Sequence, residues 1–200
     1  DQILESVIPL IVDGNNVEVT VISTWQPEPS PLPVWLGAIA GLAVATAVWL
    51  LRRRAPSPPI AFAPLIGLTS LALIIGAAQY FSLPGATGPR PVWVLVPLIA
   101  VLSASVALVA DVRGRRFAAD AAMLLAGVQL ALWGYTKRDG LSAAILPTDA
   151  PFWLDRFTTA AALIGGVAAT ALALWGLFGA GSTASATTKQ AVSGSRAPTG

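Results

Sequence analysis

The sequence has 200 residues, of which 55% are hydrophobic and 11% charged, and its formal net charge is +2. With a mean hydropathy of +0.72, this composition excludes an ordinary soluble domain and predicts a polytopic membrane protein. The basic residues lie beside apolar runs, which indicates membrane topology rather than a nucleic-acid-binding surface.

Residues 1–24 predict an extracytoplasmic β-hairpin. Residues 7–12 and 17–24 are rich in β-branched side chains and flank a turn-forming Asp-Gly-Asn-Asn sequence at 13–16. Alternation along 17–24 gives one apolar face, and an isolated two-stranded hairpin is only marginally stable in water. We therefore expect either a remnant of a larger β-domain or pairing with a partner subunit. A hairpin that lies on the bilayer surface is the alternative.

Residues 25–33 are so rich in proline that they predict a short polyproline linker. Residues 34–51 then form an apolar run without charge, long enough to cross about 30 Å of hydrocarbon as a helix. The arginines at 52–54 follow directly and indicate the cytoplasmic side. The first crossing is therefore predicted to run from outside to inside.

Four further apolar runs complete a predicted all-α, five-helix transmembrane bundle, at about 60–81, 92–110, 117–135 and 158–178. A second arginine-rich loop at 113–116 agrees with the first in direction. We expect a multi-pass protein of the plasma membrane with its N-terminus outside. Residues 179–200 are mostly Gly, Ala, Ser and Thr and predict a disordered cytoplasmic tail.

Small residues recur at helical spacing in the first and fifth runs and predict helix packing, because they allow backbones to approach closely. They are Gly37, Gly41, Ala45, Gly165 and Ala169. The sequence leaves open whether the first of these faces packs inside the chain or against another protein.

Few polar residues interrupt the apolar runs. Gln129, Ser103 and Ser105 are the polar intramembrane candidates, and a buried amide at 129 is expected to find an interhelical partner. Asp120 follows Arg116 by four positions, which predicts an ion pair on one helix face. The remaining charges of 136–157 are expected in a solvated outer loop.

The chain contains no histidine, no cysteine and one methionine. Haem, copper and zinc sites depend mainly on these residues, so we expect no metal and no cofactor. A serine triad would need a histidine, and no Gly-rich phosphate loop is present. Ionisable groups at mid-membrane depth, on which proton relays depend, are also missing from the predicted crossings. The protein is therefore not expected to be an enzyme.

The segment around 7–30, with its Val-Ile-Pro-Leu-Ile-Val-Asp-Gly start and its Trp-Gln-Pro-Glu-Pro-Ser-Pro end, resembles part of a family of actinobacterial membrane proteins of largely unassigned function. In that family an extracytoplasmic β-domain precedes several helices, and the genes often lie among copper-handling and respiratory functions. The resemblance covers about 35 residues and carries over no site residues. It implies an N-terminal β-domain and a setting near copper- or haem-dependent complexes.

Two functions from different classes fit these observations. The first is a non-catalytic accessory or scaffold subunit, which anchors an extracytoplasmic β-domain in the lipid bilayer and associates with other subunits of a larger membrane complex. The second is a small transporter or channel-like protein, whose path would be lined by Ser70, Ser103, Ser105 and Gln129. The lack of intramembrane charge favours the first.

Overall fold

The computed structural model describes residues 2–12, 14–25, 27–54, 60–83 and 90–194. Two strands come first, β1 (Gln2–Val12) and β2 (Asn15–Thr24). The helices that follow are α1 (Leu32–Arg53), α2 (Ala63–Ser82), α3 (Val92–Val112), α4 (Arg116–Thr136), η2 (Arg138–Leu141) and α5 (Phe152–Gly194). Residues 55–59 and 84–89, between the first three long helices, lie outside the described residues.

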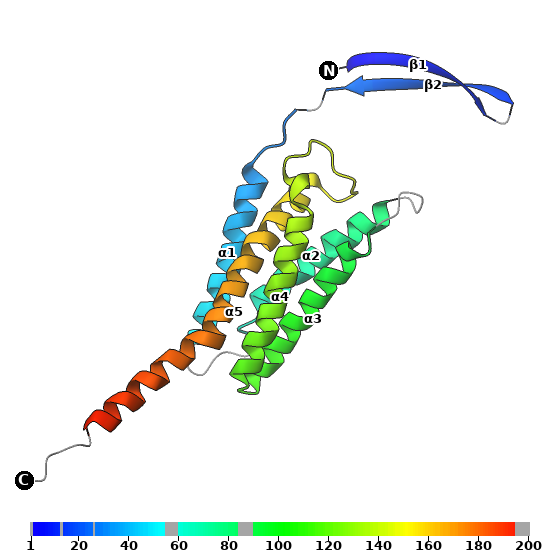
Figure 1. The fold of residues 1–200 in the computed structure, drawn as a ribbon. Helices are drawn as coiled ribbons and strands as arrows, with labels where there is room; N and C mark the ends of the chain where they lie inside the picture. The colour runs from blue at the N-terminus through cyan, green and yellow to red at the C-terminus, as the bar shows by residue number, and fades with distance from the viewer. Residues whose placement is uncertain (1, 13, 26, 55–59, 84–89, 195–200) are drawn as a thin grey trace, which may run out of the picture.

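Five of these helices are long and apolar enough to cross a membrane, counted over the described residues. The chain is therefore a multi-pass integral membrane protein, and the predicted five-helix bundle preceded by a hairpin is confirmed. Successive long helices run in opposite directions (Figure 1). We call the end of the bundle that carries residues 52–54 and 113–116 the arginine end, and the opposite end, where β1 and β2 lie, the hairpin end.

The hairpin is antiparallel, and its last pair before the turn joins Val12 to Asn15. Gly14 has φ of 79°, a left-handed conformation that glycine adopts without steric cost. The sequence Asp-Gly at 13–14 is one that tight hairpin turns favour. The strands are longer than predicted, because pairing continues through Glu5 opposite Ile22 toward the chain start. In Figure 1 the hairpin stands clear of the helices.

Helices α1 and α5 cross with their backbones almost in contact. A Cβ on Gly37 would collide with the Phe157 carbonyl of α5. A Cβ on Gly41 would collide with the Ala161 carbonyl and with the Gly165 backbone. The small-residue face of α1 is thus used inside the chain, and these two glycines are not available to another protein.

Helix α5 uses a second face of small residues against α4. Gly127 lies against the Gly166 carbonyl, where an added Cβ would come within 2.9 Å of the oxygen. Gly134 lies equally close to Leu163 of α5. The close approach of backbones gives the van der Waals contact on which helix association in lipid depends. Helix α5 is therefore the centre of the bundle, between α1 and α4 (Figure 1).

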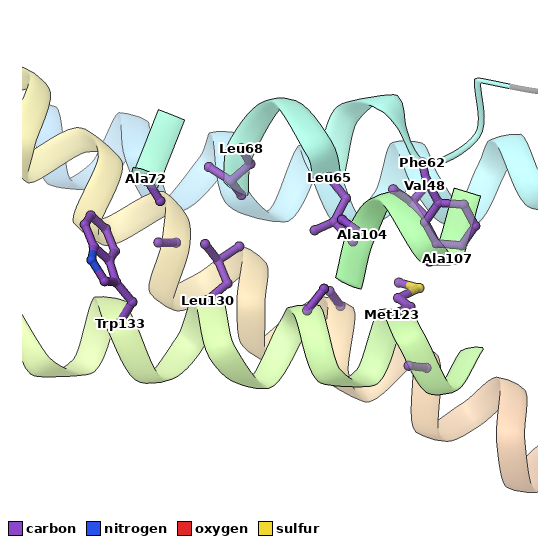
Figure 2. Close-up of a cluster of buried hydrophobic side chains, with 14 of the residues drawn as sticks. Val48, Phe62, Leu65, Leu68, Ala72, Ala104, Ala107, Met123, Leu130 and Trp133 are labelled. Carbon is purple, nitrogen blue, oxygen red and sulfur yellow. The ribbon is translucent and has the colours of Figure 1, made fainter. Parts of the chain in front are cut away.

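The core extends along α4 and α2 (Figure 2). Trp133 and Leu130 lie toward the hairpin end, and Met123 lies near Phe62 and Val48 toward the arginine end. Alanines line the buried side of α3, at positions 100, 104, 107 and 110. Small side chains there let α3 pack closely on its neighbours, because no bulky group keeps the backbones apart.

The structure differs from the sequence prediction at both ends of the fifth helix. Helix α5 begins at Phe152 rather than at 158, because the N–H groups of Leu154 and Asp155 both donate to the Pro151 carbonyl and start the first turn. Its other end is also different, since the helix continues to Gly194 where a disordered tail was expected. Adding residues to a helix that has already formed avoids the unfavourable nucleation step, so a membrane-spanning helix can continue beyond its apolar part at little cost. Residues 195–200 of that predicted tail lie outside the described residues.

Candidate functional site

At the arginine end, one arginine of α1 joins two carboxylates from other helices. Arg52 Nη1 lies 2.5 Å from Asp120 Oδ1 of α4, and Arg52 Nε lies 3.3 Å from Asp111 Oδ1 of α3. Both carboxylates are less than 10% exposed. The guanidinium also lies 5.2 Å from the ring centre of Phe62. Charged hydrogen bonds of this kind compensate for burial, so the cluster ties three helices together.

This geometry corrects the expected ion pair between Asp120 and Arg116. The Asp120 side chain is buried beside Gly176 of α5. A Cβ added to Gly176 would come within 2.7 Å of the Asp120 carboxyl carbon. Arg116 is exposed at the start of α4, and no salt bridge involves it in the described structure. Spacing along one helix could not reveal that α1 brings a better-placed cation to the same carboxylate.

A cavity of about 440 Å³ opens beside this cluster, between α1, α4 and α5. Its polar lining combines the buried cluster with two further arginines, Arg53 and Arg116. Its apolar lining is rich in large side chains: Trp49, Phe117, Met123, Leu172, Trp175 and Leu177. The arrangement can hold a molecule with an anionic group and an apolar part.

At the hairpin end a second ion pair is buried. Lys137 Nζ lies 2.8 Å from Asp155 Oδ1, and Thr159 donates to the same carboxylate at 3.1 Å. Lys137 also lies over the Trp133 ring, 4.7 Å from its centre. Burial lowers the pKa of Lys137 below its ordinary value of 10.5, and the attraction of Asp155 opposes that shift only in part.

The loop between α4 and α5 covers this ion pair. Arg156 donates to the Ala143 carbonyl at 2.6 Å and holds the loop over the helix ends, and Leu146 of the loop is buried. A cavity of about 240 Å³ remains between the loop and the bundle. Gln79 lines this cavity, and its Oε1 is buried without a hydrogen-bond partner among the described residues.

These residues correct the expectation of a solvated outer loop. Asp155 and Arg156 lie near the start of α5 and are less than 10% exposed, as is Lys137. A signal was present in the sequence, since opposite charges flank the two ends of one loop and Asp155 stands in a Phe-Trp-Leu-Asp-Arg-Phe context. An aspartate among aromatic residues costs free energy to bury unless a cation neutralises it.

The polar residues proposed as the lining of a transport path do not converge. Ser105 donates to the Val101 carbonyl of its own helix at 2.8 Å. Ser103 is buried, whereas Gln129 and Ser70 are half-buried. None of the hydrogen bonds in the described structure links Gln129 to another helix, so its expected partner is not seen. Of the four cavities described, one is lined by Ser105 and none by the other three residues.

Among the described residues, no three His, Cys, Asp or Glu side chains gather as a metal site would require. Comparison with protein-family models, with curated proteins and with solved structures finds no match to this chain. The features of the molecule that bear on its function are the two polar clusters, the cavities and the hairpin.

Proposed function

We propose that the protein is a non-catalytic membrane accessory subunit, which anchors an extracytoplasmic β-module and presents it to a partner in a larger membrane complex. One observation carries this proposal: no other part of the described structure covers the apolar face of the hairpin. Cross-strand pairs place five large aliphatic side chains on that face, each between 39% and 45% exposed, namely Ile8, Leu10, Val17, Val19 and Val21.

The two edges of the hairpin are not equivalent. Pro9 lies in β1 opposite Glu18, and a proline is accepted in a strand where its nitrogen faces away from the neighbouring strand. The ring then blocks hydrogen bonding along the outer edge of β1. Strand β2 contains no proline, so its outer edge is open to an added strand. A partner strand can pair with this edge, and a second layer of the same partner packed on the hairpin would cover its apolar face.

The bundle suits an anchoring role. Its glycine faces are used in contacts between α1, α4 and α5, and the charges of Arg52, Lys137 and their aspartates are paired at the two ends. The absence of histidine and cysteine from the whole sequence supports the non-catalytic part of the proposal. The resemblance to the actinobacterial family adds copper- or haem-dependent membrane complexes as the first partners to examine.

The proposal includes an orientation. With the arginine end in the cytoplasm, the arginines of 52–54 and 113–116 obey the positive-inside rule of the plasma membrane. The hairpin then lies outside the cell. Partners would accordingly be proteins with an extracytoplasmic β-domain.

Photo-crosslinking in intact cells tests the proposal. A benzophenone amino acid is placed at Val19, on the apolar face, and in a matched variant at Thr20, on the opposite face of the same strand. We expect a protein adduct from position 19 and little from position 20, with a β-domain protein identified by mass spectrometry and captured again from its own side. Adducts with lipid alone from position 19 would show that the hairpin lies on the bilayer, and equal adducts from both positions would show non-specific collision.

A further inference from the structure

Three arginines and two aspartates line the cavity at the arginine end, so the charged side chains around it carry a net charge of +1. Arg52 is committed to Asp111 and Asp120. Arg53 and Arg116 are exposed, and neither takes part in a salt bridge within the described structure. Two guanidinium groups are thus available to an anion.

One of these groups is already oriented. The Arg53 guanidinium stacks on the Trp49 ring, 3.7 Å from its centre. Stacking directs the guanidinium along the ring and leaves its N–H groups free to donate. Planar guanidinium groups recognise phosphate by paired hydrogen bonds. The chemistry of the polar part of this cavity therefore fits a phosphate ester.

A second hollow continues from the cavity along the outside of α1 and α5. It measures about 380 Å³ and shares Trp49 and Leu172 with the first. Its other lining residues are small or aliphatic, except for one threonine: Leu42, Ala45, Thr46, Ala168 and Ala171. The Thr46 hydroxyl donates to the Leu42 carbonyl of its own helix at 2.9 Å. The groove is therefore apolar throughout.

We propose that the cavity binds the phosphate of an anionic phospholipid from the surrounding leaflet, and that one acyl chain of this lipid occupies the groove between α1 and α5. The basic cavity lies where α1 ends, and the groove runs from it toward the middle of the same helices. Because the length of α1 matches the hydrocarbon core, its end is expected at the level of the headgroups. A soluble phosphate would satisfy the arginines and leave the groove unused. A phospholipid satisfies both parts, and basic pockets between transmembrane helices are a known setting for anionic headgroups.

The test is a lipid titration of the purified full chain in a neutral detergent, followed by native mass spectrometry. Phosphatidylglycerol, phosphatidylcholine and glycerol 3-phosphate are compared at equal concentrations. Two available guanidinium groups near the membrane surface predict about thirtyfold tighter binding of phosphatidylglycerol than of phosphatidylcholine. Glycerol 3-phosphate carries the phosphate without acyl chains and is expected to bind much more weakly than phosphatidylglycerol.

Matched variants locate the site. Arg53→Gln with Arg116→Gln should abolish the preference for phosphatidylglycerol. The control, Arg54→Gln with Arg113→Gln, removes the same charge from the same end outside this cavity and should preserve the preference. Ala168→Leu with Ala171→Leu fills the groove and should weaken the binding of phosphatidylglycerol at least severalfold. Val167→Leu, on the adjacent exposed surface, should leave this binding unchanged.

Three results would overturn the proposal. Equal binding of phosphatidylglycerol and phosphatidylcholine would show that the negative charge of the lipid plays no part in recognition. Loss of the preference in the control pair as well would assign it to the general charge of this end rather than to the cavity. Binding of glycerol 3-phosphate as tight as that of phosphatidylglycerol would identify a soluble-anion site and leave the groove without a role.

Discussion

Arg52 Nη1 lies 2.5 Å from Asp120 Oδ1, although the two residues are 68 positions apart in the sequence. The pair joins the last turn of α1 to the first turns of α4. Because Asp120 is buried, its charge requires a partner inside the bundle. The pair therefore contributes to stability as well as to helix placement.

Asp120→Asn is expected to destabilise the folded protein by about 1.5–3 kcal/mol, the usual contribution of a hydrogen bond between charged groups. Arg52 keeps Asp111 as a counter-ion, so the loss should stay below that of an isolated buried charge. The measurement is reversible unfolding of the purified chain in detergent without added lipid.

Arg116→Gln is the matched control for that experiment. The ion pair suggested by spacing alone would make it as damaging as Asp120→Asn. The structure predicts a change within about 0.5 kcal/mol, as for surface substitutions in general. Equal losses in the two variants would contradict the pairing seen here.

Gly41→Ala is expected to destabilise the bundle by about 1–3 kcal/mol, since overpacking forces backbones apart. The added methyl would meet the Gly165 nitrogen at 2.7 Å. Gly67→Ala is the control, because nothing lies within 4 Å of a Cβ there. That change should be neutral or stabilising by up to about 1 kcal/mol, from helix propensity. Unfolding of the two variants by a denaturing detergent compares them, and a loss at Gly67 equal to that at Gly41 would disprove the tight crossing.

Asp155→Asn should be strongly destabilising, by about 3–5 kcal/mol, because it leaves Lys137 buried without its counter-ion. Adding Lys137→Met removes the uncompensated charge, so the double variant should recover at least half of that loss. Asparagine keeps an oxygen for the Thr159 hydroxyl, which isolates the effect of charge. A double-mutant cycle measured by unfolding gives the coupling, and purely additive losses would show that the two groups do not interact.

The lowered pKa of Lys137 predicts a dependence of stability on pH. Between its folded-state pKa and the ordinary value of 10.5, the unfolded chain binds the proton that the folded chain has released. The free energy of unfolding should therefore rise with pH in this alkaline window, by up to about 1.4 kcal/mol per pH unit. Lys137→Met should remove this rise relative to the parent, and Lys189→Met should retain it. If the parent protein instead lost stability relative to Lys137→Met across this window, the pKa of Lys137 would be raised rather than lowered by folding.

The proposed orientation is tested by cysteine labelling in intact cells, which is clean because the natural chain contains no cysteine. Gly14→Cys, in the hairpin turn, should react with an impermeant reagent. Ser193→Cys, near the end of α5, should react only after the cells are opened. Labelling of position 193 alone in intact cells would show that the orientation is opposite to the proposed one.

The sequence by itself determined the hairpin and the five crossings, because these depend on local properties. Alternating β-branched residues around Asp-Gly define two strands and their turn. The length of each apolar run is matched to the thickness of the bilayer. The start of α5 was placed too late, because Asp155 and Arg156 read as loop residues until a buried lysine and a loop carbonyl supplied their partners.

The tertiary structure alone decided which helices meet and which charges pair. Lipid and protein interior are both apolar, so the hydrophobic pattern of a transmembrane helix does not mark the side that faces its neighbours. Gly41 is equally suited to a partner protein or to α5, and only the packed bundle shows that it meets Gly165. In the same way, Asp120 has a cation four residues away in the sequence, yet the fold brings Arg52 to it from another helix.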